Sequence, residues 1–266
     1  MSLRGKIAIV TGASAGIGRE TALELAQAGC SLAIAARRTS ELDAVALQCR
    51  TFGVACLPIT TNVTIRSDCE NLARRTIEEL GRIDILVNNA GFGIFDPIER
   101  ADVDDLRSMM DTNYFGTVHC TQAVLPHMLA RKEGSIVNVS SITGIMGYAR
   151  MGGYCATKFA VIGFTEALRD EVIGHGIRVS LICPGTTETD FFRKAERGKI
   201  PGASRLILAI PPARVARAVR AAVERGSYRT VLPVGAAAYM RLKEMFPRTA
   251  HLLMRRVSAV VERKRD

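Results

Sequence analysis

Residues 11–18 read Thr-Gly-Ala-Ser-Ala-Gly-Ile-Gly and stand between an apolar run, Ile7–Thr11, and a helical pattern at about 17–28. Glycine at such a junction permits a tight turn and lets backbone N–H groups approach a pyrophosphate at the helix N-terminus. An ordinary glycine-rich turn is the alternative interpretation, but the place directly after the first strand favours a dinucleotide site. The residues expected to line that site are Gly12, Ser14, Gly16, Ile17 and Gly18.

The rest of the chain alternates short apolar runs with longer helical patterns. Strand candidates are Ile7–Thr11, Ser31–Ala35, Ala55–Pro58, Ile83–Asn88, Ser135–Val139, Arg178–Cys183 and Thr230–Pro233. Helix candidates cover about 17–28, 40–51, 66–80, 103–130, 155–174 and 212–225. This alternation predicts an α/β fold, a doubly wound, Rossmann-type parallel sheet of about seven strands with helices on both faces. No repeat or low-complexity linker interrupts it, so we expect a single domain.

The second expected strand ends in Ala35-Ala36-Arg37-Arg38, with no carboxylate before Glu41. A dinucleotide fold that prefers NAD usually places Asp or Glu there to bind the ribose 2′-hydroxyl, whereas guanidinium groups neutralise a 2′-phosphate. A solvated pair at a strand end is the alternative. Because the glycine loop lies upstream, Arg37 and Arg38 favour NADP(H) over NAD(H).

Four further polar signals follow in a fixed order. They are Asn88-Asn89-Ala90-Gly91 after the fourth expected strand, Asn113 within the pattern 103–130, Ser140-Ser141 after the fifth strand, and Tyr154-Cys155-Ala156-Thr157-Lys158 at the start of a helix. Carboxyl ends of parallel strands form the ligand-binding edge of an open α/β sheet, so Asn89, Ser141 and the glycine loop share one rim. Tyr154 and Lys158 are four residues apart and therefore share a helix face.

These residue types suit the reduction of a carbonyl group. Hydride transfer leaves an alkoxide that must be protonated, and a tyrosine with a pKa of about 10 does this at neutral pH only if a cation lowers that pKa. Lys158 and an oxidised nicotinamide ring would supply the positive charge, and a serine hydroxyl can hydrogen-bond the substrate oxygen as charge develops there. Singly, each residue has a structural explanation as core, solvated surface or helix cap. The ordered set behind a dinucleotide loop is what indicates a reaction.

In combination, these motifs resemble the short-chain dehydrogenase/reductase family in its compact branch. The resemblance is carried by T-G-x-x-x-G-x-G, N-N-A-G, the Ser-Ser pair, Y-x-x-x-K and a later Pro-Gly pair, over roughly residues 5–235. It implies that Tyr154 is the acid/base, that Lys158 lowers its pKa and holds the ribose hydroxyls, and that Ser141 orients the carbonyl. Asn113 resembles the family residue that keeps a proton-relay water near the lysine.

The same resemblance implies further contacts and an assembly. The remaining cofactor contacts would be Asn62, Val63, Asn89, Ala90, Gly91, Tyr154, Lys158, Pro184, Gly185, Thr187 and Thr189. The stretch from Pro184 resembles the one that holds the nicotinamide amide. A homodimer or homotetramer is implied, built on the helices around 103–130 and 155–174.

Two positions depart from the family pattern. Asn62 precedes Val63 where the family often has an aspartate facing adenine, and because an asparagine oxygen can still accept that hydrogen bond we expect weakened binding. NADP-preferring members often carry a basic residue in the glycine loop, where this chain has Ser14-Ala15. The cofactor preference therefore depends on the arginine pair after the second strand.

Charge is unevenly distributed along the 266 residues. The formal net charge of +10 combines −3 over residues 1–192, with 18 Lys/Arg against 21 Asp/Glu, and +13 over residues 193–266, with 18 against 5. Seven cysteines without a C-x-x-C pair predict no metal site and a reducing, cytoplasmic compartment. No apolar stretch approaches the ~18 residues of a spanning helix, and no secretory h-region precedes the first strand.

The basic last quarter contains two segments with separate expectations. Within a catalytic domain at 1–235, residues of about 188–210 would complete the substrate pocket, whose mostly apolar walls favour a lipophilic ketone or alcohol; packing under a lid explains them equally well. Residues 236–266 would form a basic amphipathic extension, since 241–266 hold eight Lys/Arg and three Asp/Glu. Such a helix more often packs on its own domain or a second subunit than on an anionic membrane. Nucleic acid is not expected, because no binding motif accompanies the charge.

We therefore predict an NADP(H)-dependent oxidoreductase that transfers a hydride between nicotinamide and a carbonyl or alcohol substrate. One alternative is a 3-oxoacyl-carrier reductase whose basic region docks an acidic carrier, which the C-terminal extension disfavours. An alternative from another class is a non-catalytic dinucleotide-sensing or membrane-surface scaffold protein. The intact set of Ser141, Tyr154 and Lys158 argues against it.

Overall fold

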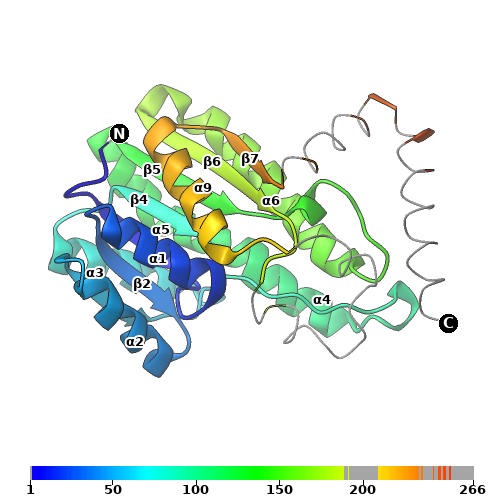
Figure 1. The fold of residues 1–266 in the computed structure, drawn as a ribbon, viewed down its shortest axis with the longest axis horizontal. Coiled ribbons are helices and arrows are strands. Elements are labelled where there is room, and N and C mark those ends of the chain that lie inside the picture. Colours follow the sequence, from blue (N-terminus) through cyan, green and yellow to red (C-terminus); the bar gives the residue numbers. More distant parts are fainter. Residues whose placement is uncertain are drawn as a thin grey trace.

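The computed structural model describes residues 2–188, 191 and 209–233, together with the isolated positions 235, 242, 245, 246, 248, 249 and 252. In this part of the chain, seven strands form one parallel sheet in the order β3-β2-β1-β4-β5-β6-β7 (Figure 1). The strands are β1 (Ile7–Thr11), β2 (Ser31–Ala36), β3 (Cys56–Thr60), β4 (Ile85–Asn88), β5 (Gly134–Val139), β6 (Ile177–Pro184) and β7 (Arg229–Leu232). The predicted doubly wound sheet is confirmed.

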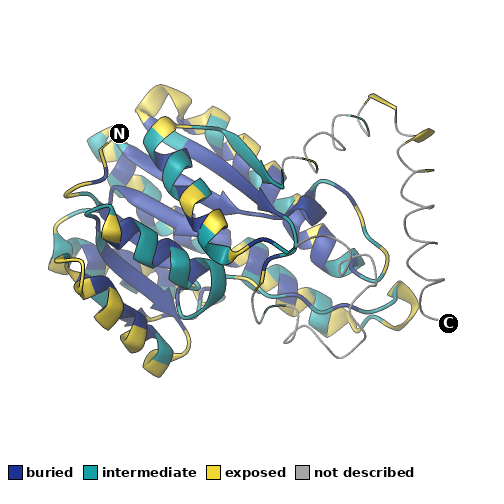
Figure 2. Cartoon of the chain, in the orientation of Figure 1, coloured by how far each residue is buried: buried dark blue, intermediate teal, exposed yellow. Residues whose placement is uncertain are grey.

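Helices cover both faces of the sheet (Figure 1). One layer holds α1 (Gly16–Gln27), α2 (Thr39–Arg50) and α9 (Pro212–Arg225); the other holds α3 (Arg66–Leu80), α5 (Gly116–Arg131) and α6 (Gly152–Val172). Leu25 and Val219 belong to the apolar core on the first side, and Leu72 and Leu168 to the core on the second. The strands between them are buried on both faces (Figure 2), which explains why they are continuous apolar runs.

The strand order reverses at β1, which pairs with β2 on one side and β4 on the other. In an open α/β sheet, the crevice outside the carboxyl ends of the strands at such a reversal is where ligands bind. The glycine loop follows β1 and the Asn89–Gly91 turn follows β4, so both lie at this reversal. The fold thus places the predicted rim residues at the switch point.

The region predicted as one helix at 103–130 has three pieces. They are α4 (Val103–Met110), a π-helical turn at Asp111–Phe115 and α5. A π-helical turn accommodates an extra residue within a helix and occurs frequently at functional sites. The apolar periodicity alone did not reveal it. Asn113 lies in this turn and is buried.

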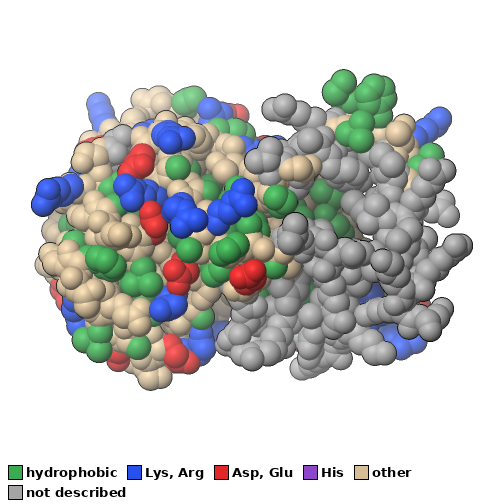
Figure 3. Space-filling view, viewed as in Figure 1, with side chains coloured by type: hydrophobic (Ala, Val, Ile, Leu, Met, Phe, Trp, Pro, Cys, Tyr) green, Lys and Arg blue, Asp and Glu red, His purple; other side chains and the backbone are tan. Residues whose placement is uncertain are grey.

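The basic last quarter is only partly described. The expected lid at about 188–210, with Thr189, and the expected extension at 236–266 lie largely outside the described residues. Helix α9 is described, and there Arg220 pairs with Glu24 of α1 at 3.1 Å and with Glu224 at 3.0 Å. Basic and acidic side chains are accordingly interspersed over α1 and α9 (Figure 3). No helix in the described part is long and apolar enough to cross a membrane.

A buried carboxylate lies at the amino end of the sheet. The Asp84 side chain is fully buried and accepts hydrogen bonds from Ile7 N and Arg82 Nε, both at 2.8 Å, and from Arg131 at 3.1 Å, with Lys6 Nζ 3.7 Å away. Burial alone would raise the pKa of Asp84, but these hydrogen bonds outweigh it and hold the pKa below its usual value. The carboxylate thereby ties β1, the start of β4 and the end of α5 together.

All seven cysteines are buried and free. The Sγ atoms of Cys69 on α3 and Cys120 on α5 are 3.4 Å apart, and Cys49 at the end of α2 hydrogen-bonds Cys56 in β3. Buried thiols of this kind behave as small hydrophobes, and they fill the layers between sheet and helices. The described residues contain no group of three or more His, Cys, Asp or Glu side chains able to hold a metal ion.

Candidate active site

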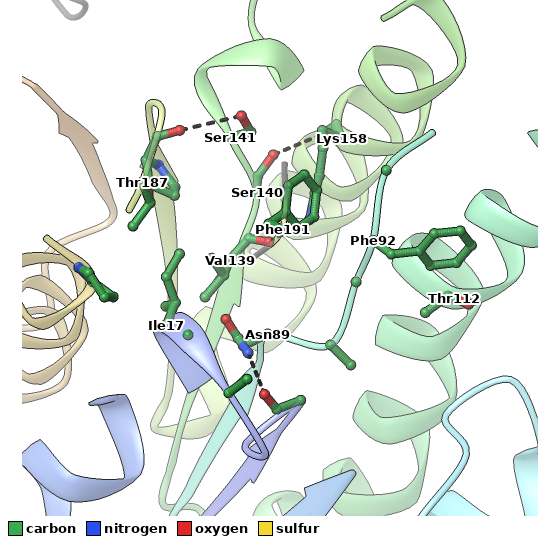
Figure 4. A pocket seen from close by; sticks show the side chains of 18 of the residues that line it. Ile17, Asn89, Phe92, Thr112, Val139, Ser140, Ser141, Lys158, Thr187 and Phe191 are labelled. Carbon is green, nitrogen blue, oxygen red and sulfur yellow. Dashed lines mark hydrogen bonds between the residues drawn. The ribbon is translucent and has the colours of Figure 1, made fainter. Parts of the chain in front are cut away.

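A cavity of about 750 Å³ lies at the carboxyl edge of the sheet (Figure 4). The predicted residues on its wall are Gly12, Ser14, Gly16, Ile17, Arg37, Arg38, Asn62, Val63, Asn89, Ala90, Gly91, Ser141, Tyr154, Lys158, Pro184, Gly185 and Thr187. Gly18 and Asn113 are not on the wall, and Thr189 lies outside the described residues. The fold therefore gathers into one space residues that are spread over most of the chain.

Close packing shapes the glycine loop. Gly12 has a φ of +66°, and a Cβ at Gly18 would collide with the Gly12 carbonyl. Asn89 Nδ2 donates to the Thr11 carbonyl at 3.0 Å, while Thr11 Oγ1 accepts from the backbone N–H groups of Asn89 and Ala90 at 3.0 and 3.1 Å. These hydrogen bonds hold the ends of β1 and β4 together. Only glycine fits at position 18, directly behind the loop.

Arg38 connects the end of β2 to this loop. Its guanidinium donates to Ser14 Oγ and to the Glu41 carboxylate, each at 3.0 Å, and Arg37 lies next to it on the cavity wall. Residues 11–18 carry no basic side chain of their own, so Arg38 brings a positive charge to the loop from the neighbouring strand. The arrangement can hold a phosphate beside the ribose of a bound dinucleotide.

The wall after β3 is held by residues that the motifs did not predict. Asn62 Oδ1, the oxygen expected to face adenine, accepts hydrogen bonds from the backbone N and Oγ1 of Thr64 at 3.3 and 3.1 Å. The Val63 carbonyl accepts from His119 Nδ1 at 3.0 Å, and a Cβ at Gly116 would lie 2.6 Å from Val63 Cγ2. The first turn of α5 therefore fixes this wall. The one sign of this close packing in the sequence is Gly116, a glycine inside the helical pattern 103–130.

Asn113 supports the wall from behind. Its Oδ1 accepts from Phe92 N, and its Nδ2 donates to the Phe92 carbonyl and to Thr157 Oγ1, all at 2.9 Å. The side chain thus ties the segment after β4 to α6, between Tyr154 and Lys158. Its role in holding a relay water stays a prediction. Thr157 was not singled out from the sequence, although it stands inside the Y-x-x-x-K motif.

The three predicted reactive side chains come from β5 and α6 and meet at the cavity wall. Ser141 Oγ donates to the Pro184 carbonyl at 3.3 Å. Lys158 Nζ donates to the Val139 carbonyl at 3.1 Å and lies 5.8 Å from the centroid of the Tyr154 ring. Figure 4 shows Ser141, Lys158 and Val139 around the same space.

Burial dominates the titration of two of these groups. The Tyr154 ring packs against Phe95 and Phe191, with ring centroids 5.8 and 5.4 Å away. Burial raises the pKa of Tyr154, and its hydrogen bond with Ser141 only partly opposes that rise. Burial also lowers the pKa of Lys158 to about 8. At neutral pH Tyr154 is thus a protonated donor. The lowering of its pKa by Lys158 stays a prediction.

One end of the cavity is largely apolar. Its wall there includes Phe92, Ile142, Tyr148, Met151 and Phe191. Tyr154 shares an apolar cluster with several of these side chains. A carbonyl group placed at Ser141 and Tyr154 would therefore have its substituents in an apolar environment.

Comparison with known proteins agrees with this geometry. A family model described as short chain dehydrogenase matches residues 6–199. The human protein "Dehydrogenase/reductase SDR family member 7" is 40% identical over 198 residues, which cover 72% of this chain and 58% of that protein. This chain thus spans less than two thirds of that relative's length. A 3-oxoacyl-acyl-carrier-protein reductase of Thermotoga maritima is 35% identical over 209 residues, covering 78% of this chain and 85% of the reductase.

Two solved structures extend the likeness to three dimensions. A short chain dehydrogenase/reductase from Burkholderia phymatum, in complex with NAD, has a TM-score of 0.85 and 25% identity and covers 92% of this chain and 95% of its own. An alcohol dehydrogenase from Thermococcus sibiricus, complexed with 5-hydroxy-NADP, has a TM-score of 0.77 and 26% identity and covers 85% and 95%. The family match covers more than half of the chain. The chain belongs to the short-chain dehydrogenase/reductase family of oxidoreductases.

Proposed function

We propose that this protein is an NADP(H)-dependent oxidoreductase that transfers a hydride between nicotinamide and the carbonyl or alcohol group of a lipophilic substrate. The observation that carries the proposal is that a glycine loop, an arginine pair and the side chains of Ser141, Tyr154 and Lys158 all line one cavity. The two solved relatives hold NAD and an NADP derivative. The proposed preference for NADP(H) therefore rests on Arg37 and Arg38.

The residues on the wall fit a dinucleotide. The first turn of α1 carries no acidic residue, so its N-terminus can face a pyrophosphate. A Cβ at Gly91 would lie 2.9 Å from Asn113 Oδ1, so only glycine packs against the asparagine behind this part of the wall. Arg38 would hold the 2′-phosphate and Lys158 the ribose hydroxyls. Pro184 to Thr187 would bind the nicotinamide amide.

In the reductive direction, a dinucleotide held by the glycine loop, Arg38 and Lys158 would supply the hydride for the carbonyl carbon. Ser141 exchanges its hydrogen bond to the Pro184 carbonyl for one to the substrate oxygen. Tyr154, which keeps its proton because burial raises its pKa, transfers that proton to the oxygen as negative charge develops there. The ammonium group of Lys158, 5.8 Å from the ring centroid, then stabilises the phenolate that remains.

Consumption of NADPH and NADH with a panel of apolar ketones tests this proposal. We expect NADPH to be preferred roughly 10- to 100-fold in kcat/KM, as charge-assisted hydrogen bonds to a phosphate would give. Tyr154→Phe should lower kcat by about 10³-fold, because it removes the proton donor and keeps the ring. Full activity of that variant would refute the mechanism. NADPH binding without turnover of any ketone would favour the scaffold alternative.

A second candidate is the reduction of a 3-oxoacyl group on a carrier protein. The likeness to the Thermotoga maritima reductase over 78% of this chain favours it. Kinetics with one 3-oxoacyl group, presented on a small thioester and on acyl carrier protein, separates the two candidates. Strong preference for the carrier-linked form would support the carrier hypothesis, and equal kcat/KM values would support a free lipophilic substrate.

We also propose a homodimer or homotetramer in a reducing compartment such as the cytoplasm. Phe115 at the end of the π-helical turn and Phe159 on α6 are 44% and 45% exposed, and a second copy would cover them. Seven buried free thiols suit a reducing environment. Light scattering should report an oligomer that Phe159→Arg dissociates. Vesicle flotation of the full chain and of a form lacking 241–266 tests the membrane alternative.

A further inference from the structure

The part of the cavity beside the arginine pair is where the base of a dinucleotide would lie. Thr61 N donates to the Ala36 carbonyl at 2.9 Å, so the chain that leaves β3 runs beside the end of β2. Arg38 follows β2, Asn62 and Val63 follow β3, and all three line the cavity. The base of a dinucleotide is attached to the ribose that carries the 2′-phosphate. A phosphate held by Arg38 therefore places the base against Asn62 and Val63.

The side-chain oxygen of Asn62 is already in use. Its Oδ1 accepts hydrogen bonds from the backbone N of Thr64 at 3.3 Å and from Thr64 Oγ1 at 3.1 Å. Because a backbone N–H can only donate, the atom that it meets must be the oxygen, which fixes the orientation of the amide. An amide oxygen has two lone pairs, and both have a partner here. The amide nitrogen Nδ2, which no hydrogen bond joins to the described part of the chain, is the group left for a ligand.

The backbone of the same turn is also engaged. The Asn62 carbonyl accepts from Ile65 N at 2.9 Å, and the Val63 carbonyl accepts from His119 Nδ1 at 3.0 Å. Asn62 N donates to Asp68 Oδ2 at 2.9 Å, which ties the turn to the first turn of α3. These bonds hold Asn62 in place on both sides of its side chain. The turn therefore offers a base one polar side-chain group, and that group is a hydrogen-bond donor.

Purine bases differ in the group at position 6. Adenine carries an amino group there, which donates, whereas a 6-oxopurine such as hypoxanthine carries an oxygen, which accepts. A carboxylate at position 62 could accept from the amino group, but Nδ2 can only donate. We propose that Asn62 is a specificity-determining residue that donates a hydrogen bond to the base, so that the site takes a 6-oxopurine dinucleotide at least as well as an adenine dinucleotide. This inference rests on the proposed function and specifies how the same cofactor site recognises the base.

The probe pair is NADPH and reduced nicotinamide hypoxanthine dinucleotide phosphate. The two ligands differ only at position 6 of the base and in the N1 proton that accompanies the oxo group. Calorimetry gives the Kd of each without any substrate present. We expect the wild-type protein to bind the hypoxanthine form at least as tightly as NADPH. A clear preference of the wild type for the adenine form would overturn the proposal.

Three variants test the role of the amide. Asn62→Asp replaces Nδ2 by an acceptor and should raise the preference for adenine roughly 10-fold, the range for a hydrogen bond to a charged group. The added negative charge repels the phosphates of both ligands alike, so it cancels in the ratio of the two Kd values. Thr64→Val frees one lone pair of Oδ1 and should shift the ratio in the same direction by less. Asn71→Asp makes the matching change on α3, outside the cavity wall, where Asn71 accepts from Arg74 at 2.6 Å, and should leave the ratio unchanged.

The ratio of the two Kd values also separates this proposal from the proposed function. If the protein bound both dinucleotides in the expected ratio but reduced no ketone, hydride transfer would fail and the base contact would stand. Ketone reduction with NADPH together with weak binding of the hypoxanthine form would give the opposite result. NADH and its hypoxanthine counterpart should show the same ratio, because the base contact does not involve the 2′-phosphate. A lower melting temperature of Asn62→Asp with the wild-type ratio would show a purely structural role and overturn the proposal.

Discussion

Two buried charges stand at opposite edges of the same sheet, and their surroundings differ. Asp84, at the amino edge, receives hydrogen bonds from Ile7, Arg82 and Arg131. Lys158, at the carboxyl edge, has one acceptor among the described residues, the Val139 carbonyl, although an ammonium group has three donors. A buried charge that holds the fold is fully paired, whereas the one beside the candidate reaction centre keeps unused donors and a shifted pKa.

Removal of the carboxyl-edge charge should affect activity most. Lys158→Met should lower kcat by about 10³-fold and raise the free energy of unfolding at pH 7 by up to ~3 kcal/mol. The gain follows because burial holds the pKa of Lys158 at about 8, so its charged form is disfavoured in the folded protein. Kinetics and urea denaturation measure the two effects. A loss of both activity and stability would make this charge equivalent to Asp84.

Removal of the carboxylate at the amino edge, Asp84, should lower stability and leave activity nearly unchanged. Asp84→Ala leaves Arg82 and Arg131 without their buried partner and should cost roughly 3–5 kcal/mol of folding free energy. In the fraction that remains folded, kcat should stay near the wild-type value, because the cavity lies at the other edge. Denaturant midpoints and active-site-normalised kcat check both parts. A large fall in normalised kcat would mean that the two edges are coupled.

Removal of Arg38 should have an effect between these two, since its side chain is 42% exposed and its guanidinium is already paired with Glu41. Arg38→Leu should raise the KM for NADPH roughly 10- to 100-fold and change the KM for NADH little. Stability should alter by less than about 1 kcal/mol, as for other exposed ion pairs. Arg66→Leu, which removes an exposed pair with Glu70, is the matched control. Equal effects on both dinucleotides would contradict a 2′-phosphate contact.

The smallest expected effects are in the pH dependence of stability. The folded pKa of Asp84 lies below the unfolded value of about 3.9, so its contribution is complete above about pH 4 and is lost as pH falls further. The folded pKa of Lys158, about 8, lies below its unfolded value of about 10.4, so the contribution of this one group to stability rises with pH between them, whereas buried thiols such as Cys30 and Cys183, whose pKa burial raises, act in the opposite direction. Urea denaturation across pH should show the acid slope weakened in Asp84→Asn, and the stability advantage of Lys158→Met over the wild type shrinking as pH rises from 8 to about 10.4.

The sheet was predictable because buried parallel strands are apolar runs bounded by turns. Every predicted strand is present in the structure, and the glycine loop lies where its position after β1 placed it. The division of the helix expected at 103–130 could not be predicted, because the π-helical turn at Asp111–Phe115 leaves the apolar pattern continuous. Asp84 lay inside an apolar run, and nothing local showed that Arg82 and Arg131 would meet it there.

The candidate site was predicted as a set of wall residues, but not how they are supported. The ordered motifs and the family resemblance that they carry identified Ser141, Tyr154 and Lys158, and the spacing of four residues put Tyr154 and Lys158 on one helix face. The hydrogen bonds from His119 to Val63 and from Asn113 to Thr157 join elements far apart in sequence, so no motif spacing predicts them.

The seven buried thiols allow local opening motions of the native protein to be measured by chemical labelling. A thiol reagent can modify a cysteine only when the layer around it opens, so labelling rates measure local opening free energies. Cys49 and Cys56 report on the β3 margin, Cys69 and Cys120 on the contact between α3 and α5, and Cys155 and Cys183 on the candidate active site. Thiol labelling followed by mass spectrometry, with and without NADPH, would therefore show in which of these regions a bound dinucleotide suppresses local opening and in which it does not.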